Sequence, residues 1–174
     1  MITRIRGGFV RHQAGAAAVE FALIVPMLFA LIFSTIEVGW TMVQTIMLER
    51  GLDLTVRSLR IGSLANPTQT LIRQAVCKQA MVLNDCVNTL TIELIPITKE
   101  ADYPTDSSRC INRGSKVAPV LRFDAGSRSQ TVFVRACFVV SPLTPGLGVG
   151  LALPKDNTGA YRIIAKSAFV NEPS

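Results

Sequence analysis

The chain has 174 residues, which is enough for one or at most two domains. Charged residues make up only 17%, apolar residues 49%, and the mean hydropathy is +0.37, so the composition excludes a disordered chain and is too hydrophobic for an ordinary soluble domain. The net charge is +6, but Arg4, Arg6 and Arg11 contribute half of it, and the later basic residues are interleaved with acids. We therefore expect no nucleic-acid partner.

The first predicted element is a membrane-spanning helix at about residues 16–36. From Ala14 to Ile36 the chain runs for 23 residues in which Glu20 is the only charged side chain. At ~1.5 Å per residue such a helix covers the ~30 Å hydrocarbon core of a bilayer. A buried core helix is the alternative, but this segment is apolar on all sides rather than amphipathic. The arginines before it predict that the N-terminus is cytoplasmic and that the rest of the chain is extracytoplasmic.

Residues 1–15 differ from an ordinary secretory signal peptide. Such a peptide has an apolar run of only ~7–15 residues that ends in small residues. Here the run is longer, and the small residues from Ala14 to Ala18 precede it. If the chain is cut after Gly15, Ala16 becomes a cationic N-terminus and Glu20 becomes mature position five.

Glu20 is an ionisable residue inside the predicted membrane segment, and such residues are costly unless they are paired or near the interface. A carboxylate there suits the N-terminus of its own helix, and it is also placed to neutralise the Ala16 amine of a neighbouring subunit. The alternative is that Glu20 only lies at the level of the cytoplasmic headgroups.

The N-terminal segment resembles the TadE-like family, pseudopilins of the tight-adherence (Flp) pilus system. The matching residues are a basic leader, a Gly-Ala boundary, an apolar core with one acid, a proline, and a second acid followed by glycine: Gly15, Ala16, Val19–Leu23, Pro26, Glu37 and Gly39. The chain is also similar at its far end, where Phe169–Pro173 resembles the family's closing Asn-Glu-Pro strand. The resemblance implies prepilin-type cleavage between Gly15 and Ala16, an assembly role for Glu20 and Phe21, and a second family acid at Glu37.

By this resemblance the protein is a minor pilin in tight-adherence pilus assembly, surface adherence and biofilm formation. Its implied location is the bacterial inner membrane, with incorporation into the pilus left open. Its implied partners are a prepilin peptidase, other pilins and the assembly platform. The alternative function is that of an uncleaved single-pass membrane protein whose extracytoplasmic domain binds a partner in the envelope.

Beyond the membrane the helix is expected to continue to Gly62, because Thr41–Arg60 contains no proline and carries an apolar stripe: Leu48, Leu52, Val56 and Leu59. A second helix is predicted to begin at Asn66-Pro67-Thr68-Gln69, with Asn66 as its cap. Its apolar stripe is Ile72, Val76, Ala80 and Leu83.

From Asn88 the pattern changes from helical to alternating, which predicts strands. The first follows Leu90, Ile92 and Leu94, and the others are predicted at 117–123, 131–140 and 162–170. Long loops are expected at 98–116 and 141–160. Residues 66–174 are thus predicted to form an extracytoplasmic α+β domain, in which a pilin-like helix pair packs on a small antiparallel sheet.

The four cysteines all follow the predicted membrane segment. An even count in an oxidising compartment indicates two disulfides, for which three connectivities are possible. We expect Cys77–Cys86, a short loop, and Cys110–Cys137, which ties a polar loop to a strand. The spacings contain no C-x-x-C and no histidine accompanies them, which argues against a zinc site and a thioredoxin-like site.

Catalytic chemistry has no candidate residues, so we expect neither an enzyme nor a bound cofactor or metal. The single histidine, His12, lies in the leader, apart from every potential triad partner. The Gly146–Gly150 run lacks the spacing and lysine of a nucleotide loop. Asp102, Asp106 and Asp124 are too widely spaced for an EF-hand calcium loop. The uncharged stretch Pro142–Pro154 is instead typical of a contact with a partner or a membrane.

Overall fold

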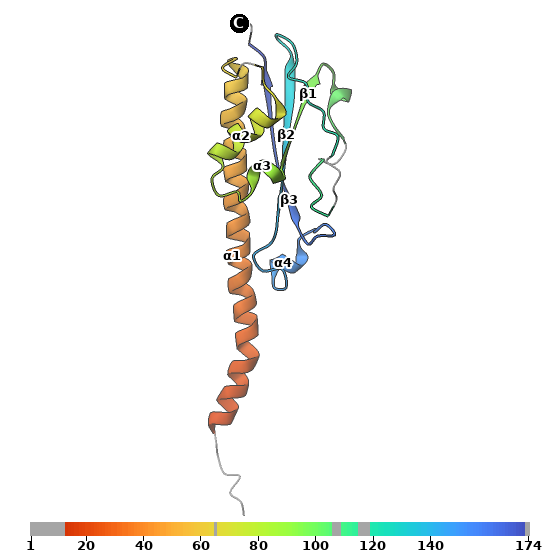
Figure 1. Ribbon diagram of the computed structural model, residues 1–174. Coiled ribbons are helices and arrows are strands. Elements are labelled where there is room, and N and C mark those ends of the chain that lie inside the picture. Colours follow the sequence, from red (N-terminus) through yellow and green to blue (C-terminus); the bar gives the residue numbers. More distant parts are fainter. Residues whose placement is uncertain (1–12, 65, 106–108, 115–118, 173–174) are drawn as a thin grey trace, which may run out of the picture.

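The computed structural model describes residues 13–64, 66–105, 109–114 and 119–172. Its elements are, in order, α1 (Gln13–Arg60), α2 (Gln69–Gln79), α3 (Cys86–Thr89), β1 (Leu90–Ile97), the 3₁₀ turn η1 (Glu100–Asp102), β2 (Thr131–Val140), α4 (Val149–Ala152) and β3 (Tyr161–Val170). The predicted α+β class is therefore confirmed. Figure 1 shows α1 as a long rod whose C-terminal half carries the rest of the fold, while its N-terminal half projects alone.

Helix α1 is one unbroken element of 48 residues, as the sequence predicts for its continuation beyond the membrane segment. It continues through Pro26, and it ends just before Gly62, whose φ of +68° is the left-handed conformation common after helices. The four stripe residues Leu48, Leu52, Val56 and Leu59 are all buried. The C-terminal half of α1 is thus an amphipathic core helix fused to an apolar one.

The cap of α2 differs from the prediction. Thr68, rather than Asn66, is the capping residue, and its side-chain oxygen accepts a hydrogen bond from the backbone N–H of Leu71. Asn66 lies two residues earlier with a φ of +50°, so it turns the chain into the helix instead. The predicted stripe on α2 and the turn after it is buried: Ile72, Val76, Ala80 and Leu83.

The sheet has three strands in the order β1-β2-β3, and both pairs are antiparallel. The prediction of a strand at 117–123 is wrong. Residues 117 and 118 lie outside the described part, and the remainder makes one isolated parallel bridge, between Leu94 and Phe123. Pro119 has no backbone N–H to donate to a ladder, and the described part of the segment pairs with β1 only at Leu94, whose backbone bonds Arg122 and Asp124.

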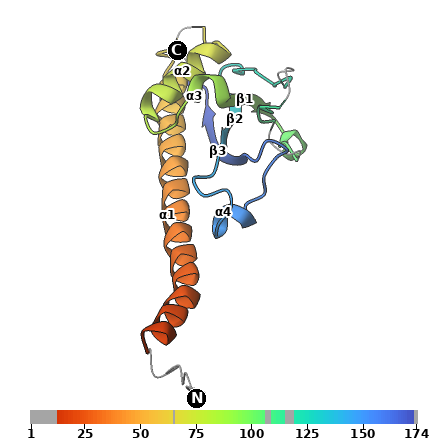
Figure 2. The ribbon, with the colours of Figure 1, turned by 60° about the horizontal axis from the view of Figure 1, so that its bottom comes forward.

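One face of the sheet packs against the helices. The side chains on this face alternate along each strand, as in Leu90, Ile92 and Leu94 of β1, and they share a core cluster with the stripes of α1 and α2. β3 follows α1 closely, and Figure 2 shows this strand lying between the rod and β2. The core is therefore a layer of helix on sheet built along half of α1.

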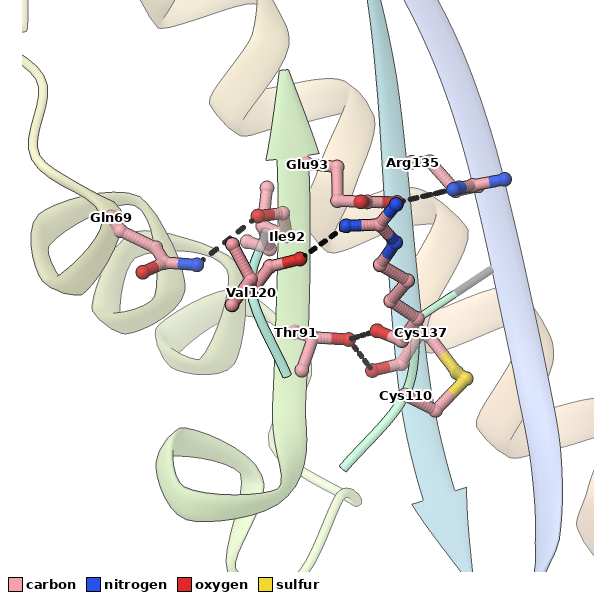
Figure 3. Close-up of polar contacts among 9 residues, drawn as sticks. Gln69, Thr91, Ile92, Glu93, Cys110, Val120, Arg135 and Cys137 are labelled. Atoms are coloured by element: carbon pink, nitrogen blue, oxygen red, sulfur yellow. Dashed lines mark hydrogen bonds and ion pairs between the residues drawn. A yellow bond between two sulfur atoms is a disulfide. The ribbon is translucent and has the colours of Figure 1, made fainter. Parts of the chain in front are cut away.

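The opposite face of the sheet is covered by the long connection between β1 and β2. Thr91 donates its hydroxyl to the backbone oxygen of Arg109, and the ring of Tyr103 meets that of Phe133 edge to face at 5.7 Å. Beneath this cover Arg135 donates to Glu93 at 2.8 Å, and both side chains are at least 96% buried (Figure 3). The pair is desolvated, so losing either partner is expected to cost about 3–5 kcal/mol.

Candidate functional site

The N-terminal half of α1 presents apolar side chains to its surroundings on every side. Gly15–Arg60 is the described helix that is long and apolar enough to cross a membrane, and its most apolar stretch is not buried in the fold. Phe21, Leu23 and Met27 are 69–75% exposed. Exposed apolar surface of this extent requires a lipid or protein environment.

The residues of the predicted processing site lie at the free end of this helix. Gly15, Ala16, Glu20 and Phe21 are all exposed. No atom lies within 4 Å of the position that a Cβ on Gly15 would occupy, so packing within the chain gives no reason for a glycine there. Residues 1–12, which include His12 and the three arginines, lie outside the described residues.

Glu37 lies at the other end of the apolar segment, and the structure does not bring it near Glu20. The two acids are seventeen positions apart on the helix, about 25 Å at ~1.5 Å per residue. Unlike Glu20, Glu37 is completely buried. Its carboxylate accepts hydrogen bonds from the backbone N–H groups of Leu143 and Thr144, at 3.1 and 2.8 Å, and from the Thr144 hydroxyl at 2.9 Å. Glu37 thus holds the β2–β3 connection against α1.

Three further polar residues of α1 continue this interface on both sides of Glu37. Ser34 accepts from the backbone N–H of Val149, Thr41 shares a 3.0 Å hydrogen bond with the Tyr161 hydroxyl, and Gln44 accepts from the same hydroxyl at 3.4 Å. We name Ser34, Glu37, Thr41 and Gln44 the polar seam. Burial of the Tyr161 ring is the main cause that raises the pKa of its hydroxyl, and the charge of Glu37 adds to it.

Sequence reasoning identified Glu37 only through the family resemblance and missed the seam. A signal was present, since residues 34, 37, 41 and 44 repeat at the same three-and-four spacing as the apolar stripe that begins at Leu48. When polar residues continue the spacing of a buried apolar stripe, they indicate that the same face of the helix is also buried beyond the apolar core. The partners, more than 100 residues away in the sequence, leave no local trace.

The residues at the C-terminal end close the fold at the far end of α1. Asn171 donates its side-chain amide to the backbone oxygens of Ala125 and Ser127, which holds the turn before β2. Glu172 pairs with Arg60 at 2.7 Å on the surface. The Asn-Glu part of the predicted motif therefore joins the end of β3 to the end of α1, and Pro173 lies outside the described residues.

Both expected disulfides are present. Cys77–Cys86 ties the end of α2 to the start of α3, and Cys110–Cys137 ties the covering connection to β2 (Figure 3). Among the described residues no group of three or more His, Cys, Asp and Glu side chains is arranged to hold a metal ion. The distinctive feature is instead the long helix: one half bare and apolar, the other built into an α+β domain through the polar seam.

The fold and the helix define a class, namely an α+β domain built on the extension of a candidate membrane-spanning helix. Comparison with known families is more specific, because residues 15–57 match the family model described as TadE-like protein. The resemblance is thereby confirmed for the N-terminal segment, which is TadE-like. The match ends before α2 and does not include the C-terminal residues. No curated protein and no solved structure matches the chain significantly.

Proposed function

We propose that this protein is a minor pilin or pseudopilin that acts without catalysis in the assembly of a tight-adherence pilus, and so supports surface adherence and biofilm formation. The observation that carries the proposal is the coincidence of the TadE-like match, residues 15–57, with α1, residues 13–60. The matched segment includes both the bare apolar half and the half that carries the domain. A subunit of this shape presents an apolar helix for lateral packing and keeps its domain outside the membrane.

In this proposal α1 crosses the bacterial inner membrane once, with the basic residues 1–15 in the cytoplasm and the domain outside it. Positive residues before the apolar segment support that orientation. Two disulfides in the domain support it as well, because disulfides persist in oxidising compartments.

Prepilin peptidase then removes residues 1–15 by cutting between Gly15 and Ala16. The open space around Gly15 supports this step, because a glycine in a helix costs about 1 kcal/mol relative to alanine and nothing in the fold requires it here. The new Ala16 amine would be a charge at the membrane boundary. Glu20 and Phe21, both exposed on the helix that begins there, are the residues we assign to contact with a neighbouring pilin.

The testing variant is Glu20→Ala, with Glu49→Ala as its matched control, since Glu49 is an exposed acid of the same helix beyond the membrane segment. Loss of one partner of a poorly solvated ion pair costs on the order of 3–5 kcal/mol, which lowers association a hundredfold or more. We expect Glu20→Ala to insert and be processed, yet to lose its crosslinks to other pilins in membranes. Glu49→Ala should keep them.

Intact mass spectrometry of the membrane-extracted protein accompanies this experiment and reports the N-terminus. A mass that begins at Ala16 supports cleavage, whereas an intact Met1 favours the uncleaved single-pass protein with a partner in the envelope. Undiminished crosslinks and normal piliation in Glu20→Ala would remove the pairing from the proposal.

A further inference from the structure

The connection between β2 and β3 forms an apolar projection from the domain. We name residues 142–154 the apolar loop; they carry no charged side chain. Leu143, Leu147 and Leu151 are 53%, 44% and 63% exposed. Three exposed leucines on one short uncharged segment are more than scattered surface residues, and an apolar surface of this kind marks a contact.

The apolar loop is docked on α1 by hydrogen bonds and a close backbone approach. Glu37 accepts its hydrogen bonds from Leu143 and Thr144, and Ser34 accepts from Val149. At Gly148 the loop approaches so closely that a Cβ would lie 2.0 Å from the Ser34 hydroxyl oxygen. The level of the loop along α1 is therefore that of residues 34–37.

That level coincides with the end of the apolar half of α1. Twenty-one residues, 16–36, rise about 31 Å at ~1.5 Å per residue, which is the thickness of a bilayer's hydrocarbon core. Figure 1 shows α4, which belongs to the apolar loop, as the part of the folded domain nearest to the bare half of the rod. A bilayer that surrounds residues 16–36 reaches its boundary where the loop is docked.

The residues around the loop have the character of a membrane boundary. Trp40, the single tryptophan, is partly exposed one turn beyond Glu37, and tryptophan is enriched at membrane–water interfaces. Lys155, the first charged residue after the loop, donates its ammonium group to the backbone oxygen of Pro145 at 3.3 Å. Lysine at this level is placed to face lipid phosphates.

We propose that the apolar loop inserts Leu143, Leu147 and Leu151 into the boundary of the bilayer on the domain side, as a second lipid contact beside α1. Ile36, the neighbour of Glu37, is 51% exposed, so α1 also presents apolar surface at the level of the loop. A single helix does not fix the tilt and rotation of the domain relative to the membrane, whereas two lipid contacts do. This inference rests on the membrane crossing of α1 and is independent of the pilus role.

The test places single tryptophans in the full chain, in a Trp40→Phe background, in nanodiscs of phosphatidylethanolamine and phosphatidylglycerol. Leu151→Trp is the probe, and Leu147→Trp repeats it. Met27→Trp, in the middle of the apolar half, reports insertion of α1. Met81→Trp is the matched control, since Met81 is 84% exposed and directly follows Ala80, which packs against Gly51 about 21 Å further along α1 than Glu37.

Brominated acyl chains are expected to remove most of the emission of Leu151→Trp, Leu147→Trp and Met27→Trp, and to leave that of Met81→Trp unchanged. Aqueous iodide should quench the emission of Met81→Trp and leave most of the emission of the other three variants. If Met27→Trp is quenched by the lipid while both loop probes respond only to iodide, the loop lies in water and is left for a protein partner or a second copy. That result overturns this inference and leaves the proposed function standing. If Met27→Trp is not quenched, α1 is not inserted and both fail.

Discussion

At the residue scale, Glu37 shows how one buried charge can organise a distant part of the chain. A carboxylate without exposure is stabilised only by the donors that surround it, and three donors here come from two adjacent residues of the apolar loop. Glu37 thus makes the position of that loop dependent on one side chain of α1.

Glu37→Ala should release the loop and lower the free energy of unfolding by about 1–3 kcal/mol, because donors that the carboxylate satisfied lose their acceptor. The measurement is urea unfolding of the oxidised full chain in detergent, together with limited proteolysis at residues 142–154. Glu49→Ala, an exposed acid of the same helix, is the control and should stay within about 0.5 kcal/mol of the parent chain. Equal stability of the two variants would contradict the assignment.

Tyr161 makes the stability that the polar seam contributes depend on pH in the alkaline range. Burial raises the pKa of its hydroxyl above the ordinary value of about 10, so the folded state keeps a proton that the unfolded state loses. The free energy of unfolding should therefore fall as the pH rises above about 10. Unfolding curves at pH 9–11 check this, and Tyr161→Phe should show a smaller fall than the parent chain. Identical pH dependence in both proteins would be the contrary result.

At the element scale, Gly51 explains how closely α2 approaches α1. Glycine is unfavourable inside a helix, yet a Cβ at Gly51 would lie 2.8 Å from the backbone oxygen of Val76 and 3.4 Å from the Cβ of Ala80. The atom in the way is backbone rather than a flexible side chain. Gly51 therefore lowers the helix propensity of α1 but allows α1 and α2 to pack closely.

Gly51→Ala should consequently destabilise the protein by about 1–3 kcal/mol despite its better helix propensity, because α2 must move away from α1. Gly39→Ala is the matched control in the same helix. Nothing lies within 4 Å of its Cβ position, so the substitution should be neutral or stabilise by up to about 1 kcal/mol. Thermal unfolding followed by circular dichroism measures both, and a stabilised Gly51→Ala would show that the helices separate freely.

The elements that repeat a local pattern were predictable, and those defined by distant contacts were not. The continuation of α1, the strand at 131–140 and the strand at 162–170 followed from their spacing, and β3 begins one residue earlier than predicted. The segment 117–123 alternates in the same way, but its described part pairs with β1 at one bridge, Leu94 with Phe123, and this distant contact is not visible in the local pattern. Glu37 was found through family resemblance, while its role as an acceptor depends on residues 106 and 107 positions away.

On the scale of the whole molecule, two disulfides stabilise the α+β domain by different amounts. The Cys110–Cys137 bond closes a loop of sequence separation 27, and the Cys77–Cys86 bond closes one of 9. The longer loop loses more conformational entropy in the unfolded chain, by about 1 kcal/mol in the chain-entropy description.

Cys110→Ser/Cys137→Ser should therefore lower the free energy of unfolding by about 1 kcal/mol more than Cys77→Ser/Cys86→Ser. Denaturant unfolding of the oxidised variants gives the two differences, and non-reducing peptide mapping first establishes that the remaining bond is intact. A larger loss from the shorter loop would show that native contacts, rather than loop closure, dominate.

The strand that covers α1 most closely is β3, the element furthest from it along the sequence. Contacts of such long sequence separation form late in folding. Until residues 161–170 have been synthesised, the face of α1 that β3 covers in the folded domain lacks this cover. During that interval the face is open to other helices of the same kind. We therefore expect completion of the domain to act as a timing step, after which α1 offers only its bare half to neighbours.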